Sequence, residues 1–157
     1  TCWPNSESGT TGAALAAAML VGPAQVAGRL VEFVWLSRWH PLLSARLAAL
    51  AHPLGAAVLL LAAPAAAAML VPLFALLHGT GNGILTIAKG TLPLAIFGPA
   101  GYGQRLGWLM APSRIAQAFA PLLFGLAMQQ WGAGALLVSA AVMAAGFVAL
   151  MLLPRGR

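Results

Sequence analysis

A stripe of polar side chains is the place in this sequence where solute chemistry is easiest to envisage. His78, Asn82, Thr86 and Lys89 recur at spacings that place them on one face of a helix, inside an otherwise apolar stretch. A polar face is costly where it meets lipid, so it should face a neighbouring helix or a water-filled cavity. Three glycines alternate with polar residues over 79–83. They indicate either a helix that bends to line a substrate path or a surface for close helix packing, and both interpretations stay open.

A second polar pair opens a later apolar block. Arg114 and Gln117 are three residues apart, on one face of a predicted helix. If that helix begins near Gly107, Arg114 lies about two turns inside it, deep enough to need a partner or a wet cavity. The alternative is an arginine that reaches the membrane interface along its flexible stem. We predict that His78, Asn82, Thr86, Arg114 and Gln117 line a substrate pathway.

A third polar face closes the first apolar block. Gln25, Arg29 and Glu32 share one helix face, and Gly28 lies beside Arg29. A small residue such as Gly28 would let another helix approach. Arg29 and Glu32 could then pair at the inner surface as a gate that forms and breaks. The alternative is that these charges only anchor the helix at the interface.

Catalytic and metal chemistry is poorly represented. The three histidines, His40, His52 and His78, are far apart in the sequence, with no carboxylate or thiol spaced near them, so we expect no metal site. The chain has no aspartate, and Glu7 and Glu32 fall on opposite sides of the predicted membrane, so a Ser-His-Asp set is not possible. His52 precedes a proline, which indicates a packed histidine at a kink, with proton titration as the alternative. We expect neither an enzyme nor a cofactor.

The elements that must position these residues are membrane helices. Only 6% of the 157 residues are charged, against about a quarter in soluble domains, and the mean hydropathy is +0.91. A soluble domain, a disordered chain and a disulfide scaffold are therefore excluded, the last because Cys2 is the one cysteine. The net charge of +6 is scattered at the edges of apolar blocks and forms no patch, so we expect no nucleic-acid partner.

The number of membrane spans follows from the lengths of the charge-free stretches. Those between Glu7 and Arg29, between Arg46 and Lys89, and between Arg114 and Arg155 are long enough for one, two and two helices of about 20 residues. The predicted fold is an all-α membrane protein with spans near residues 11–31, 47–65, 67–88, 107–129 and 134–153.

This span count places every basic residue on one face of the membrane. The positive-inside tendency then predicts an outside N-terminus and a cytoplasmic C-terminus. Residues 1–10 would be a polar, non-cytoplasmic start, 11–154 the transmembrane bundle and 155–157 a cytoplasmic tail. The polar start is expected to be a truncated or misread piece of a longer chain.

Three glycine-containing stretches carry a family resemblance. They are Gly22–Arg29, Gly79–Gly83 followed by Gly90–Pro93, and Phe97–Gly103. Over roughly residues 11–154 they resemble helices eight to twelve of the C-terminal half of major facilitator superfamily transporters. The first stretch is similar to a degenerate copy of that family's cytoplasmic loop motif. Its glycine and arginine map to Gly28 and Arg29, and its usual aspartate is missing.

The resemblance implies a secondary transporter that moves a small solute by alternating access, coupled to protons or to the solute's own gradient. The N-terminal half of the same polypeptide would be its partner, the present chain a C-terminal fragment, and a bacterial inner membrane its location. A non-transporting helical partner or assembly subunit is the main alternative. A membrane-embedded enzyme is the weakest, because no carboxylate, metal-ligand or nucleophile cluster is present in the sequence.

Overall fold

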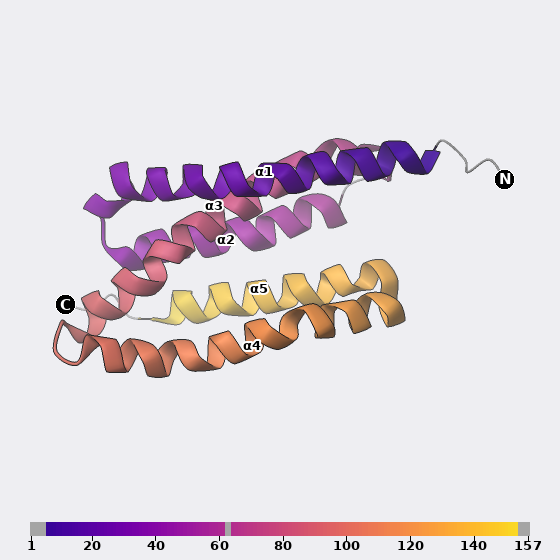
Figure 1. Ribbon diagram of the computed structural model, residues 1–157. Coiled ribbons are helices and arrows are strands. Elements are labelled where there is room, and N and C mark those ends of the chain that lie inside the picture. Colours follow the sequence, from indigo (N-terminus) through magenta and orange to yellow (C-terminus); the bar gives the residue numbers. More distant parts are fainter. Residues whose placement is uncertain (1–5, 62–63, 154–157) are drawn as a thin grey trace.

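The computed structural model describes residues 6–61 and 64–153, and within these residues the chain forms long helices joined by short connections (Figure 1). The α-helices are α1 (Ser6–Val34), α2 (Pro41–Leu60), α3 (Pro64–Phe97), α4 (Tyr102–Trp131) and α5 (Ala135–Leu152). Single 3-10 turns occupy Leu36–Arg38 and Gly132–Gly134. All five α-helices are long and apolar enough to cross a membrane. The predicted all-α fold with five spans is confirmed, and the protein is a multi-pass helical membrane protein.

The helices extend past the predicted spans at several ends. α3 continues through Lys89 to Phe97, and α4 already begins at Tyr102. A charged residue ends an apolar run but does not end a helix, because lysine is a good helix former. α1 begins at Ser6, so part of the predicted polar start belongs to this helix. Residues 1–5 and the tail 155–157 lie outside the described residues.

Local chemistry fixes the start of α2. His40 is its N-cap, with the ring Nδ1 accepting a hydrogen bond from the Leu42 backbone N–H at 3.1 Å, and Pro41 occupies the first helical position. Proline is favoured there because its missing N–H would have no partner within the helix. His40 therefore has a capping role, which accounts for one of the three histidines.

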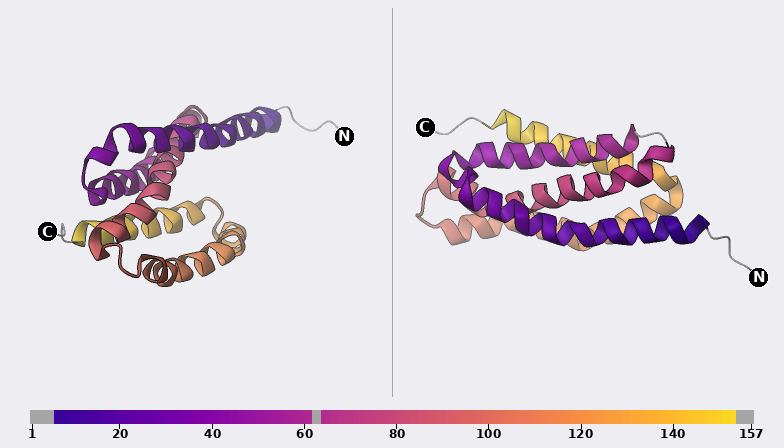
Figure 2. Two further views of the ribbon diagram at one scale, coloured as in Figure 1. Left: turned by 60° about the vertical axis from the view of Figure 1, so that its left-hand side comes forward. Right: turned by 90° about the horizontal axis from the view of Figure 1, so that it is seen from above.

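α1 and α2 both pack along α3, and α2 also packs against α5 (Figures 1 and 2). The alternating glycines of α3 divide between two neighbours. A Cβ at Gly79 would lie 2.7 Å from the Ala24 Cβ of α1, and a Cβ at Gly81 would lie 2.8 Å from the Ala48 carbonyl of α2. α3 stays α-helical through this segment, and these glycines lie at close helix contacts, as the packing interpretation expects.

α4 is held much less closely. It contacts α3 only sparsely, it runs beside α5, and none of its residues is buried. Large side chains such as Trp108 and Ile115, exposed by 76% and 61%, cover its outer surface. Such a surface suits lipid or further helices, because both remove apolar side chains from water.

The two ends of the helical chain lie at opposite ends of the bundle: α1 begins at one end and α5 finishes at the other (Figure 1). The α1–α2 and α3–α4 connections lie at the end where α5 finishes. An odd number of crossings requires this arrangement.

Candidate functional site

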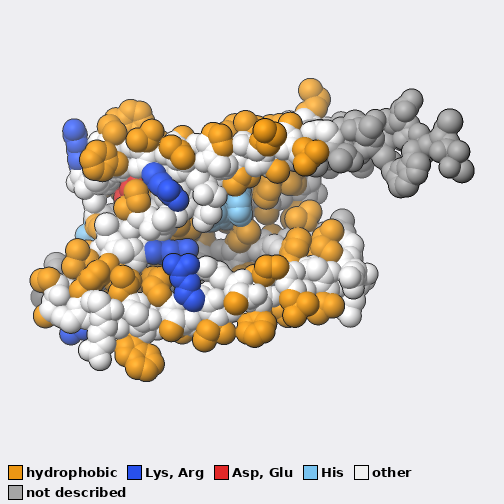
Figure 3. Space-filling view, in the orientation of Figure 1, with side chains coloured by type: hydrophobic (Ala, Val, Ile, Leu, Met, Phe, Trp, Pro, Cys, Tyr) orange, Lys and Arg blue, Asp and Glu red, His pale blue; other side chains and the backbone are white. Residues whose placement is uncertain are grey.

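A cavity of about 630 Å³ lies between α3 and α4. Figure 3 shows several Lys and Arg side chains gathered near the middle of this face, where the upper and lower groups of helices meet. The lining combines polar side chains with a few apolar ones: Asn82, Thr86, Lys89 and Gly90 from α3, and Leu106, Met110, Ser113, Arg114 and Gln117 from α4. On each helix the lining residues recur three or four positions apart, so each helix contributes one continuous face.

The α3 wall presents an amide, a hydroxyl and an ammonium group. The Thr86 hydroxyl donates to the Asn82 backbone carbonyl at 2.8 Å. This bond leaves the Thr86 oxygen able to accept a hydrogen bond. Within the described residues, the Asn82 amide and the Lys89 ammonium have no side-chain hydrogen bond of their own, so both remain available to a solute or to water.

The α4 wall holds its charge deep in the helix. Arg114 is twelve residues beyond Tyr102, where α4 begins, which is about 18 Å along the helix axis at 1.5 Å per residue. Its guanidinium donates to the Gln117 side-chain oxygen at 3.3 Å, and the Ser113 hydroxyl donates to the Met110 carbonyl at 2.9 Å. An arginine this far from a helix end needs a partner or a water-filled cavity. Arg114 has Gln117 as its partner and lines this cavity.

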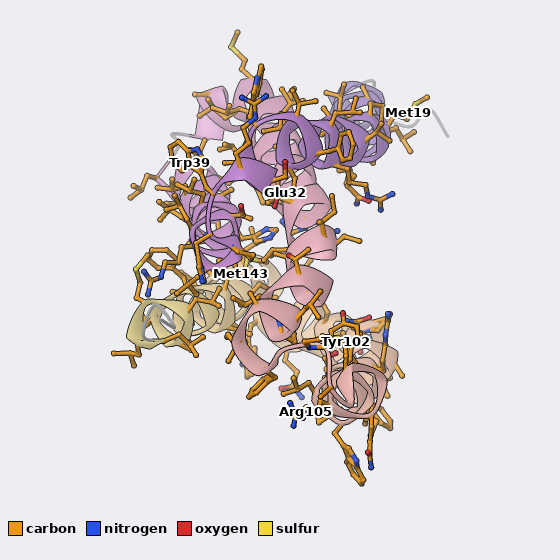
Figure 4. The ribbon with its side chains drawn as sticks, turned by 90° about the vertical axis from the view of Figure 1, so that its left-hand side faces the viewer. Met19, Glu32, Trp39, Tyr102, Arg105 and Met143 are labelled. Carbon is orange, nitrogen blue, oxygen red and sulfur yellow. The ribbon has the colours of Figure 1, made fainter. Side chains whose placement is uncertain are left out.

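A tight corner joins the two walls at one end. Gly98 and Gly101 adopt φ values of +72° and +64°, which side chains other than glycine rarely tolerate. The Tyr102 hydroxyl then donates to the Gly90 carbonyl at 2.9 Å, and Arg105 donates to the Phe97 carbonyl at 2.8 Å. Figure 4 shows Tyr102 and Arg105 at this junction. α3 and α4 are therefore fastened together beside the cavity.

The cavity is electropositive. Lys89 and Arg114 line it, and no carboxylate does. The whole sequence contains only two carboxylate side chains: Glu32 is buried elsewhere, and Glu7 belongs to the first turn of α1. Nothing in the cavity lining offsets the two positive charges.

The structure brings four of the five predicted pathway residues to this cavity: Asn82, Thr86, Arg114 and Gln117. His78 is not among its lining residues. It instead meets His52 of α2, with the two Nδ1 atoms 3.2 Å apart, and its ring stacks on Phe74. His52 and His78, although 26 residues apart in the sequence, therefore meet in the structure. Among the described residues, no three His, Cys, Asp or Glu side chains form a group that could hold a metal ion.

The four predicted gate residues have separate environments. Glu32 is 4% exposed and points into the interior of the helix group (Figure 4). The Ser44 hydroxyl faces it from α2, but neither Glu32 Oε2 nor Ser44 Oγ has a hydrogen-bond partner. Arg29 is exposed, and no ion pair joins it to Glu32 in the described part of the chain.

The other two gate residues take part in helix packing. A Cβ at Gly28 would collide with the Thr80 carbonyl of α3, and the backbone of Gln25 lies against Gly83 in the same way. These contacts hold α1 against α3. The structure therefore does not assemble Gln25, Gly28, Arg29 and Glu32 into one polar cluster.

Sequence reasoning left out some of the lining. Lys89 belongs to the polar stripe of Asn82 and Thr86, but it is not among the predicted pathway residues. Ser113 is four residues before Gln117 and so shares its helix face, a signal that the sequence prediction did not use. Leu106 and Met110 are apolar, so nothing in the sequence distinguishes them from residues that face lipid.

Compared with protein-family models, with curated proteins and with solved structures, the chain gives no match. The comparisons therefore identify no family, and the description as a multi-pass helical membrane protein rests on the helices themselves.

Proposed function

We propose that the protein is a secondary transporter that moves a small solute by alternating access, as a permease or efflux protein similar to the major facilitator superfamily. The observation that carries this proposal is the polar cavity between two membrane helices, with Arg114 far from either end of α4. Polar and charged groups at such depth are expensive and are typical of solute pathways. A solute pathway would explain why polar and charged groups lie at this depth.

The two walls of the cavity are also held differently, which suits movement. α3 is fixed between α1 and α2 by close glycine contacts, whereas α4 has no buried residue. A displacement of α4 away from its corner would break few packing contacts. Elements with few buried contacts are the ones that move at low free-energy cost.

The proposal includes the remaining features of such a transporter. A second helical half of the same polypeptide would cover the exposed surface of α4, with lipid around both halves. Transport would be coupled to protons or to the solute's own gradient, and no chemical reaction is assigned to the site. The N-terminus of the chain would lie outside a bacterial inner membrane and its C-terminus in the cytoplasm.

Alternating access can be tested without knowing the solute. In the full-length polypeptide, with Cys2 and any cysteine outside these 157 residues replaced by serine, Asn82→Cys and Gln117→Cys would be treated with a membrane-impermeant maleimide, in sealed right-side-out and inside-out vesicles. Both positions should react from both sides, because each conformation opens the cavity to one side.

Ile115→Cys is the matched control. Ile115 lies on the face of α4 opposite to the cavity-lining residues and is 61% exposed there. It should react from neither side, because lipid or another helix covers it. Reaction of Asn82→Cys and Gln117→Cys from one side only would contradict alternating access.

A helical partner or assembly subunit is the second candidate. The favouring observation is the continuous exposed surface of α4, where a large apolar patch is typical of a protein or lipid contact. One-sided labelling of the cavity would favour this candidate, since a static cavity opens in one direction only.

A further inference from the structure

The charge of the cavity limits what it can bind. Its α3 wall carries Lys89 and its α4 wall carries Arg114, and both side chains are exposed to the space between the helices. A cationic solute entering this space would meet two like charges, with no carboxylate among the described lining residues. Repulsion of this kind is strong where protein and lipid lower the dielectric constant.

The hydrogen-bonding groups of the cavity also favour a ligand with negative charge. Lys and Arg side chains only donate, and the Asn82 and Gln117 amides add N–H donors. The Gln117 side-chain oxygen already accepts from Arg114, so this acceptor is partly satisfied. Donors around two cations suit oxygen atoms that carry negative charge, and guanidinium groups bind carboxylate and phosphate especially well.

We propose that the solute of this cavity carries an anionic oxygen group, a carboxylate or a phosphate, held between Lys89 and Arg114. This inference rests on the proposed transport function and adds the class of substrate. The cavity volume of about 630 Å³ lies within the usual range of about 300–1,000 Å³ for small-molecule sites. The space suits a small organic anion.

A first experiment measures the charge of the cavity directly. Ser113→Cys, in the full-length polypeptide with Cys2 replaced by serine, would react with two thiosulfonate reagents of similar size, one with a sulfonate and one with a trimethylammonium group. The anionic reagent should react faster, and Lys89→Gln or Arg114→Gln should each lower the ratio of the two rates by roughly tenfold, as loss of one nearby charge at intermediate dielectric implies.

Two controls protect this measurement from indirect effects. Arg38→Gln removes an equal charge from an exposed residue outside the cavity and should leave the ratio unchanged. Arg114→Lys keeps the charge and should retain most of the preference, which separates charge from misfolding. A ratio that is equally insensitive to Lys89→Gln, Arg114→Gln and Arg38→Gln would overturn the proposal.

A second experiment identifies the ligand class by protection of Ser113→Cys from a neutral thiol reagent. Succinate or phosphate should slow the reaction, and sorbitol or choline chloride at matched osmolarity and ionic strength should not. Lys89→Gln and Arg114→Gln should each abolish the protection. Protection by choline or sorbitol, with none by the anions, would overturn the proposal.

Membrane lipid could supply the same anionic chemistry through its headgroups. The protection assay would therefore be run in vesicles of phosphatidylcholine alone and in vesicles that also contain phosphatidylglycerol. Protection by succinate or phosphate in phosphatidylcholine alone supports a soluble anion. Protection that requires phosphatidylglycerol and is indifferent to the soluble anions would make the lipid headgroup the ligand and overturn the assignment to the solute.

These results are separable from the test of transport itself. Anion protection together with one-sided cysteine labelling would keep the anion site and remove alternating access. Two-sided labelling without anion protection would keep the transporter and remove the anionic solute.

Discussion

Glycines decide how closely the helices of this protein approach. Gly28, Gly79 and Gly83 lie where α1 and α3 meet, and a Cβ at any of them would collide with the other helix. Close backbone approach at small residues is a main source of helix association in membranes, where lipid removes most of the hydrophobic drive. These residues therefore hold the α3 wall of the cavity in place.

Replacing one of them by alanine should destabilise the protein. Gly83→Ala places a methyl group against the Gln25 carbonyl of α1, and overpacking of this kind costs about 1–3 kcal/mol. The higher helix propensity of alanine offsets about 1 kcal/mol of this cost. We expect a lower thermal unfolding midpoint in detergent, followed by tryptophan fluorescence.

Gly107→Ala is the matched control, because nothing lies within 4 Å of its Cβ position on α4. Its midpoint should stay unchanged or rise slightly with the better helix propensity. Equal shifts for Gly83→Ala and Gly107→Ala would contradict the assigned packing.

Residue spacing alone grouped most of the polar residues that line the cavity, and the position of His78 outside its lining has a geometric cause. The spacing places His78 on the face shared by Asn82 and Thr86. Helices cross at an angle, so one face meets different neighbours along its length. At the level of His78 the neighbour is His52 of α2, and further along it is α4.

At the scale of the helices, Arg46 fastens the end of α5 to α2. Its guanidinium donates to the carbonyls of Leu150, Met151 and Leu153 at 3.1, 3.1 and 2.8 Å. The last carbonyls of a helix have no partner within it and carry partial negative charge, so a cation is stabilising there. The sequence suggested only a topology signal for this arginine.

Arg46→Met should loosen α5. The variant keeps much of the apolar stem and loses every hydrogen bond to the helix end. Hydrogen bonds from a charged donor contribute about 1.5–3 kcal/mol each, but these lie partly in solvent, so we expect a total loss of about 2 kcal/mol. Thermal unfolding in detergent and faster proteolysis near the C-terminus would report it.

Arg38→Met provides the comparison, because Arg38 is exposed and makes no side-chain hydrogen bond among the described residues. It should leave both measurements unchanged. Arg46→Lys should fall between the two, since a single ammonium cannot reach three carbonyls with the same geometry. If Arg46→Met behaves like Arg38→Met, the contact does not stabilise α5.

At the scale of the whole molecule, the order of the helices fixes which connections share a side. The α1–α2 and α3–α4 connections lie at one end of the bundle (Figure 1), and the 3-10 turn before α5 lies at the other. Arg38 lies within the α1–α2 connection, and Arg105 lies in the first turn of α4, just after the α3–α4 connection. On the positive-inside tendency, we propose that this end faces the cytoplasm.

This orientation predicts a pattern of labelling. In the full-length polypeptide with Cys2 replaced by serine, Ser37→Cys and Ala100→Cys should react with an impermeant maleimide only in inside-out vesicles. Gln130→Cys should react only in right-side-out vesicles. The opposite pattern would reverse the orientation, and a mixed pattern would contradict the five crossings.

The sequence by itself determined that this protein lies in lipid and that its secondary structure is helical. Charge-free runs such as 47–88 require lipid and predict helices, because length, hydropathy and charge are properties of one segment at a time. Helix periodicity likewise grouped Asn82 with Thr86 on one face and Arg114 with Gln117 on another.

Only the tertiary structure decided which faces meet. It placed Lys89 in one cavity with Arg114, paired His52 with His78, and turned Arg46 toward the end of α5. These contacts depend on how far each helix rotates and at what angle it crosses its neighbours, and the period of a single helix contains neither quantity. The positive charge of the cavity is a property of two helices together.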